Sequence, residues 1–323
     1  MTPRPVTLQI SLAPSDWRHA QVLLGHQVRT WRGQVAEILI TVDFHRSSGR
    51  FSENWADGES KILPLANSIE GARVVTVDYG TASKARVAGE FFDGRPVPTK
   101  DFRGGPYYSY FFGLAEAQHD HVLHADSDMF FGGGSKTWMA EAIAHMQDHP
   151  EILLAAPLSG PPRADGRLLT LAAKREPGDR PAYLFDEMSS RLFLMSRTRF
   201  RTAIGALHAR RPLALKNSVI ALLEGNPPQD LPEHLFTGAM RECRLVRREF
   251  LGEAPGMWSL HPPYRGADFY NKLPDLVRRI EAGDVPDEQR GCHDLNASLV
   301  DWSEGVAALR RNRLWRRLLP GVR

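Results

Sequence analysis

Two aspartates separated by a single residue follow an apolar run in the middle of the chain. Asp126 and Asp128 come after residues 121–125 and before the glycines 132–134, which we expect to end a strand. Strand side chains alternate with a period of two, so both carboxylates are expected on one side, at the strand's carboxyl end. A divalent cation that prefers oxygen ligands would relieve their repulsion. The pattern indicates a metal held between carboxylates and substrate phosphates, although ordinary solvated strand ends carry the same tripeptide.

Two further aspartates end predicted strands in the first half of the chain. Residues 6–13 and 36–43 are predicted to be strands on either side of a helix that stops at Gly33, and residues 72–78 a third strand. This succession predicts a parallel sheet, which binds ligands at the carboxyl ends of its strands. Asp43 and Asp78 are therefore expected near the central pair, with Asp43 where a bound nucleotide would lie.

The remaining segments are predicted to alternate between helices and strands. Helices are expected over residues 107–117, 136–148, 199–209 and 233–243, and strands over 151–157, 191–196 and 244–250. The last of these is expected to be an edge strand. Two segments rich in proline and glycine, 94–106 and 159–181, are expected to be a mobile loop and a long loop or hairpin.

The composition is that of an ordinary globular protein. The chain has 323 residues, enough for one large or two small domains. Lys and Arg exceed Asp and Glu by only 41 − 38 = 3, which does not indicate a nucleic-acid partner. Cys243 and Cys292 have no metal-ligand spacing, and no signal peptide or membrane-spanning run is recognisable. A reduced, cytoplasmic protein is therefore expected.

The order of these landmarks resembles that of the GT-A glycosyltransferases, most closely the inverting family 2 type. The landmarks are the unit ending at Asp43, the Asp126-Ser-Asp128 motif, the helix start at Glu233 and Trp258-Ser-Leu-His261. The resemblance implies an α/β fold with a mixed, mostly parallel sheet flanked by helices. It implies a catalytic domain over 1–275, with a nucleotide-sugar half (1–131) and an acceptor half (132–275), followed by a C-terminal helical extension (276–323).

The resemblance also implies roles for the candidate donor-site residues. In this family the Asp-x-Asp motif binds Mn²⁺ or Mg²⁺ and, through the metal, the diphosphate of a nucleotide-sugar, by family habit a UDP-sugar. Asp128 would be the direct metal ligand, and Asp126 would contact the ribose or the metal shell. Asp43 would bind the nucleoside, and His261 would be a further metal ligand, an imidazole that suits manganese. The metal would neutralise charge on the leaving diphosphate.

Inverting transfer also requires a general base that deprotonates the acceptor hydroxyl. In the family this carboxylate opens a helix, and the matching place here has the sequence Asp230-Leu-Pro-Glu233. Glu233 is the expected base and Asp230 the reserve, with Asp186 and its neighbour Glu187 as a third possibility. The simpler alternative is that Glu233 only complements the helix dipole.

Three cations are candidates for binding the donor's phosphates. They are Arg103, which lies beside two glycines, Lys100 and Arg265. The alternative for each is an ordinary surface charge. The pair His293-Asp294 follows the region of resemblance and is expected to be a structural turn.

The expected function is sugar transfer from a nucleotide-sugar to a small-molecule, glycan or lipid-linked acceptor. One alternative is a nucleotidyltransferase acting on a sugar phosphate, but its glycine-rich loop after the first strand is missing from residues 14–18. A phosphatase is a weaker alternative, because its Asp-x-Asp nucleophile would follow an early strand. A non-catalytic scaffold that binds a nucleotide or a partner is the third.

Leucine and tryptophan alternate with arginine near the end of the sequence, over residues 306–319. This pattern is compatible with peripheral contact with an anionic membrane. It is equally compatible with packing of the apolar side on the catalytic domain.

Overall fold

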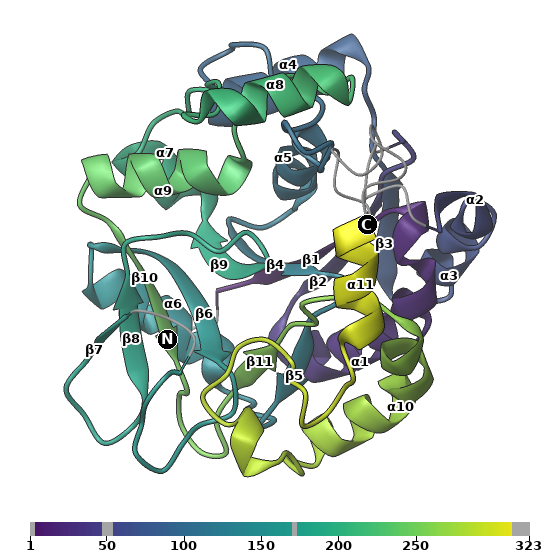
Figure 1. The fold of residues 1–323 in the computed structure, drawn as a ribbon. Coiled ribbons are helices and arrows are strands. Elements are labelled where there is room, and N and C mark those ends of the chain that lie inside the picture. Colours follow the sequence, from purple (N-terminus) through teal and green to yellow (C-terminus); the bar gives the residue numbers. More distant parts are fainter. Residues whose placement is uncertain (1–3, 47–53, 170–172, 312–323) are drawn as a thin grey trace.

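A mixed, mostly parallel β-sheet forms the centre of the molecule (Figure 1). The computed structural model describes residues 4–46, 54–169 and 173–311. In spatial order the main path of the sheet is β3 (Ala72–Thr76), β2 (Glu37–Val42), β1 (Val6–Leu12), β4 (His121–Asp126), β9 (Leu192–Ser196), β6 (Ile152–Ser159), β10 (Val246–Phe250), β8 (Ala182–Phe185) and β7 (Lys174–Arg175). The first four strands are parallel, and β9 is antiparallel to both of its neighbours. The predicted α/β architecture is confirmed.

Strand β1 aligns the part of the sheet that carries the candidate donor site. Ile10 lies opposite Ile40 of β2 on one side and opposite Ala125 of β4 on the other. Because all three strands are parallel and in register, they end at the same edge of the sheet, at Leu12, Val42 and Asp126. The predicted strands over residues 6–13, 36–43 and 72–78 are therefore confirmed, each with slightly narrower bounds.

Helices cover both faces of the sheet, giving three layers (Figure 1). One face packs against α1 (Trp17–Trp31), α3 (Ile62–Asn67) and α6 (Trp138–Asp148). The other packs against α4 (Thr81–Phe91), α5 (Tyr108–Glu116), α7 (Arg197–Ala203) and α9 (Pro232–Glu242). In α1 the buried residues Ala20, Leu24 and Val28 recur every four positions, so a single apolar stripe faces the sheet.

A short two-stranded ribbon follows β4 and is covered by another helix. Strand β5 (Phe130–Gly132) is antiparallel to β11 (Trp258–Leu260), and α10 (Ala267–Glu281) packs beside α1 and over β5. The expectation that the glycines end the strand is wrong for Gly132, which lies in β5 opposite Trp258. A Cβ atom on Gly132 would come within 2.1 Å of the Trp258 ring, so glycine is required there by the indole rather than by a turn.

The expectation of an edge strand at residues 244–250 is also wrong. Strand β10 lies between β6 and β8, inside the sheet. Arg247 and Glu249 are charged, but both side chains are buried and form an ion pair with each other. Arg247 also donates a hydrogen bond to the backbone carbonyl of Glu187 at 3.0 Å. Mutual neutralisation allows these two charges inside the sheet.

Three helices lie outside this pattern: α2 (Trp55–Gly58), α8 (Leu215–Leu223) and α11 (Ser303–Arg311). Residue 275 lies within α10, so the boundary expected there falls inside a continuous helix. The division into two halves and an extension stays a prediction. Most of the segment 306–319, for which membrane contact was considered, lies outside the described residues.

Candidate active site

The candidate metal ligand Asp128 lies just beyond the end of the central strand β4. The strand ends at Asp126, so the two-residue alternation does not extend to Asp128. The Asp126 side chain is 42% exposed and the Asp128 side chain only 6%. The two carboxylates therefore do not form the equivalent pair that the spacing predicted, and Asp128 is the buried member.

Within the described part of the chain, one oxygen of the ionised Asp128 carboxylate has no partner. Its Oδ2 accepts a hydrogen bond from Nη2 of Arg265 at 2.7 Å and lies 3.6 Å from Nε2 of His261. Its Oδ1 is buried and has no hydrogen-bond partner among the residues that the structure describes. Burial alone would raise the pKa of Asp128, but the nearby His261 and Arg265 hold it well below the ordinary value. A buried oxygen of this kind is available to a cation.

The His261 imidazole is oriented by a second carboxylate. Its Nδ1 lies 3.3 Å from Oδ1 of Asp294, while Nε2 faces Asp128. The Asp294 carboxylate is also 3.7 Å from the Arg191 guanidinium. A histidine held in this way presents its other nitrogen as a ligand. Asp294 was expected only in a structural turn. Its contact with His261 spans 33 residues of sequence, so local patterns did not reveal it.

Arg265 joins the starts of two helices at this site. It immediately precedes Gly266, the N-cap of α10, and its guanidinium lies 3.4 Å from Oδ1 of Asp16, the N-cap of α1. One arginine thus serves the carboxylates of both Asp16 and Asp128. Burial raises the pKa of Asp16 to about 6, even though Arg265 opposes this shift. Asp16 was not among the candidate residues from the sequence, so its part in this cluster was missed.

Asp128 and His261 suit a divalent cation only if a substrate completes the coordination of that cation. Within residues 4–46, 54–169 and 173–311, no three His, Cys, Asp or Glu side chains gather closely enough to hold a metal by themselves. Asp128 offers a free oxygen and His261 an oriented nitrogen, a mixed ligand set that manganese accepts. Water and the oxygens of a diphosphate would have to supply the other ligands.

Asp43 occupies a separate, aromatic part of the same sheet edge. Its carboxylate accepts hydrogen bonds from the Tyr79 hydroxyl at 3.0 and 3.1 Å and lies 3.4 Å from Nζ of Lys100. The Tyr79 ring lies between the rings of His45 and Tyr108, with centroid distances of 4.7 and 4.8 Å. Lys100, which was predicted to bind phosphate, is thus buried against Asp43.

The two other residues considered for this edge are exposed. The Asp78 carboxylate accepts hydrogen bonds from the backbone N–H of Gly80 and the hydroxyl of Ser83, just before and within the first turn of α4. Arg103 is exposed, and its guanidinium lies over the Phe102 ring at 5.1 Å.

Among the candidate bases, Glu233 is the carboxylate least committed to structure. It is half-buried in the first turn of α9. Burial raises the pKa of the Tyr110 hydroxyl, and the charges of Asp126 and Glu233 raise it further, so both carboxylates lie within electrostatic range of this tyrosine. Tyr110 is thus a residue whose pKa both Asp126 and Glu233 influence.

The other two candidate bases hold structural interactions. Asp230 is buried and accepts hydrogen bonds from Nδ1 of His234 at 2.7 Å and from the Leu231 N–H at 2.9 Å. Asp186 is exposed and accepts a hydrogen bond from Arg241, which also bonds Glu187. Neither is placed as a free base.

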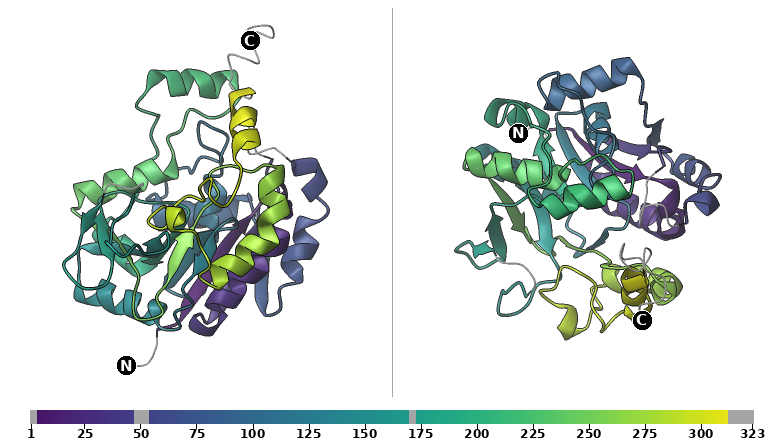
Figure 2. Two further views of the ribbon diagram at one scale, coloured as in Figure 1. Left: turned by 60° about the horizontal axis from the view of Figure 1, so that its bottom comes forward. Right: turned by 45° about the horizontal axis from the view of Figure 1, so that its top comes forward.

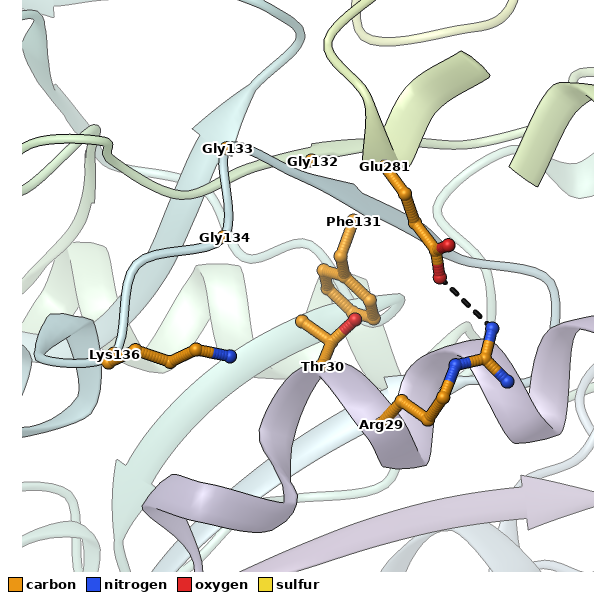
Figure 3. Close-up of a pocket in the computed structure, with 8 residues that line it drawn as sticks. All are labelled: Arg29, Thr30, Phe131, Gly132, Gly133, Gly134, Lys136 and Glu281. Carbon is orange, nitrogen blue, oxygen red and sulfur yellow. Dashed lines mark hydrogen bonds and ion pairs between the residues drawn. The ribbon is translucent and has the colours of Figure 1, made fainter. Parts of the chain in front are cut away.

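A shallow hollow of about 260 Å³ lies at the C-terminal ends of α1 and α10, away from Arg265 at their starts (Figure 3). Its lining comes from the ends of these two helices, from β5 and from the residues that follow β5: Arg29, Thr30, Phe131, Gly132, Gly133, Gly134, Lys136 and Glu281. Figure 3 shows the ion pair between Arg29 and Glu281, at 3.0 Å, along one side. Asp128 and His261 do not line this hollow, so it is not the candidate active site.

Comparison with protein-family models gives no match, and neither does comparison with curated proteins. Similar solved structures exist at low identity. One is glucosyl-3-phosphoglycerate synthase from Mycobacterium tuberculosis in complex with Mn²⁺, UDP and phosphoglyceric acid (13% identity, 86% of this chain, 77% of that chain, TM-score 0.38). Another is GalNAc-T7 with UDP, GalNAc and Mn²⁺ (14% identity, 80% and 43%, TM-score 0.40). A third is S. aureus TarS with UDP-GlcNAc (9% identity, 84% and 65%, TM-score 0.41). Likeness at this level assigns no family to the chain.

Proposed function

We propose that this chain is a metal-dependent glycosyltransferase that uses a nucleotide-diphosphate sugar, with UDP as the expected nucleotide. One observation carries the proposal. Asp128, just beyond the carboxyl end of a central parallel strand, has a buried oxygen with no partner in the described ranges, beside an imidazole that Asp294 orients. Sheets of this kind bind ligands at that edge. A buried, ionised carboxylate with an unused oxygen is suited to a divalent cation.

The surroundings of Asp128 suit the diphosphate of the donor. The start of α1 and the start of α10 meet there through Arg265, and helix starts favour anions because their N–H groups point outward. Arg265 can form bidentate bonds to phosphate oxygens. A bound metal would supply Lewis-acid stabilisation of the leaving diphosphate. Asp43 and the adjacent tyrosines would bind the nucleoside at the end of β2, which β1 separates from β4.

Glu233 is the proposed general base for an inverting transfer. It would accept the proton of the acceptor hydroxyl while the new glycosidic bond forms. This assignment is supported by its half-buried place in the first turn of α9. It is also supported by the hydrogen bonds that already engage Asp230 with His234 and Asp186 with Arg241. The acceptor, whether a small molecule, a glycan or a lipid-linked sugar, would lie on this side of the site.

A second candidate function is a scaffold that binds a nucleotide without turnover. The contact between Arg265 and Asp128 favours it, because the guanidinium already neutralises the carboxylate that a metal would use. The nucleotidyltransferase alternative has less support. A short 3₁₀ turn, Pro14–Asp16, follows β1 where that class would have its glycine-rich loop.

A donor-turnover assay distinguishes the two candidates. The wild-type protein is incubated with a panel of nucleotide-sugars and Mn²⁺, and release of the nucleoside diphosphate is measured with and without mixed sugar acceptors. We expect Glu233→Gln to keep donor affinity and to lower transfer by about 10²- to 10⁴-fold, as loss of a general base does. Glu242→Gln, an exposed change at the other end of α9, is the matched control. Metal-dependent binding without any turnover by the wild type would favour the scaffold.

A further inference from the structure

Helix α8 exposes a stripe of large apolar side chains. Leu215, Val219, Leu222 and Leu223 are 78%, 49%, 78% and 59% exposed, and Leu213 just before the helix is 88% exposed. The four helical positions are separated by four, three and one residues, so they lie along one face. Scattered exposed leucines are common, but a continuous stripe of this kind marks a contact surface.

The opposite side of α8 makes only a small contact with the rest of the molecule. Ala221 is fully buried and packs with Phe102 and Leu231 in a cluster of three residues. A helix that belonged to the core would turn its leucines inward and its small residues outward. In α8 the small residue Ala221 faces inward and the leucines face outward. Contacts within this chain therefore explain the burial of Ala221 but leave the leucines exposed.

Positive charge accompanies the apolar stripe. Residues 210–224 contain Arg210, Arg211 and Lys216 against the single acid Glu224, and the side chains of Arg211 and Lys216 are exposed. This combination of apolar and cationic groups complements a surface with anionic headgroups over an apolar interior. It does not complement a second copy of α8, whose cations would repel these.

The C-terminal helix also carries an exposed apolar side chain. In the left view of Figure 2, α8 is raised above the body of the protein, and α11 also lies near the top of that view. Leu309 of α11 is 40% exposed. In the sequence, residues 310–323 contain six arginines and no acidic residue. None of the helices in the described part of the chain is long and apolar enough to cross a bilayer.

We propose that α8 docks this protein onto an anionic lipid surface. The leucines enter the boundary between headgroups and acyl chains, and Arg211 and Lys216 contact lipid phosphates. The inference does not depend on the proposed activity. Through the cluster of Ala221, Phe102 and Leu231, docking would hold the start of α9 close to the lipid surface.

Vesicle flotation with the full chain tests the proposal. Vesicles of phosphatidylcholine alone are compared with vesicles that also contain phosphatidylserine. We expect binding to the anionic vesicles, and a decrease of about tenfold or more in the double variant Leu215→Ser/Leu222→Ser, because both side chains would leave an apolar phase. Leu169→Ser is the matched control, since Leu169 is 52% exposed and lies outside α8. Lys216→Glu should weaken binding to anionic vesicles only.

Each opposite result counts against lipid docking. Binding of the double variant equal to that of the wild type would overturn it, as would the absence of wild-type binding to anionic vesicles. Light scattering that shows a dimer dissociated by the same leucine changes would identify a second copy as the occupant instead. Because the changed side chains are exposed, unaltered thermal unfolding verifies that each variant is folded.

Discussion

Asp16 offers a test of the charge balance around the candidate metal site. Its carboxylate lies 3.4 Å from Arg265, which also binds Asp128 at 2.7 Å, so two carboxylates share one guanidinium. The Asp16 side chain is only 17% exposed. Burial raises its pKa from the ordinary 3.8 to about 6. Ionised Asp16 is therefore a destabilising element of the folded protein near neutral pH, and Asp16→Asn should stabilise it.

The size of this effect follows from the shift in pKa. A rise of roughly two units corresponds to about 3 kcal/mol, at about 1.4 kcal/mol per unit. Because the folded pKa of Asp16 is raised, its favourable contribution is complete below the unfolded pKa of 3.8 and is lost as the pH rises through about 6. Asp16→Asn should therefore increase the free energy of unfolding by up to about 3 kcal/mol near pH 7.5, but by only about 1 kcal/mol near pH 4.5.

Urea unfolding of the wild type and of Asp16→Asn at these two pH values gives the required difference. The asparagine oxygen can still accept the hydrogen bond that the Ala13 N–H donates to Asp16 at 2.9 Å, so any change in that bond should be similar at both pH values. The reasoning would be refuted by a stability difference that does not depend on pH, or by a loss of stability that is larger at neutral pH.

Two further changes test the metal site and the packing of β5. Asp294→Asn should weaken manganese affinity by about 10- to 100-fold while the fold is kept, because His261 would lose the carboxylate that orients it. Calorimetric titration with manganese and a saturating nucleotide measures this affinity, and an unchanged value would remove Asp294 from the site. Gly132→Ala should destabilise the protein by about 1–3 kcal/mol, because the new Cβ would overlap the Trp258 ring. Thermal unfolding measures that loss, and full stability would show that the ring can move aside.

The sequence predicted the parallel half of the sheet well because its information is local there. Strands β1, β2 and β4 are apolar runs bounded by turns or aspartates, and α1 has a regular apolar stripe. The structure confirms these elements with small differences in their ends. Strand β10 was misplaced at an edge, because its charged side chains neutralise each other inside the sheet in a way that a single strand's pattern cannot reveal.

The candidate site was predictable only in part, since its contacts join distant segments. Asp128 was identified from the Asp-x-Asp pattern and His261 from the family resemblance, and the structure brings them within 3.6 Å of each other. The roles of Asp16 and Asp294 depend on how α1 and the chain after α10 fold back toward β4, and no local spacing encodes this. Lys100 was expected at a phosphate but lies against Asp43.

A calorimetric titration of UDP into the protein, with and without Mn²⁺, tests the metal-dependent donor site most directly. We expect binding that requires the metal in the wild type, is lost in Asp128→Asn, and is kept in Asp148→Asn, an exposed change at the end of α6. UDP binding of equal affinity with and without manganese, or unchanged in Asp128→Asn, would contradict the metal-dependent donor site.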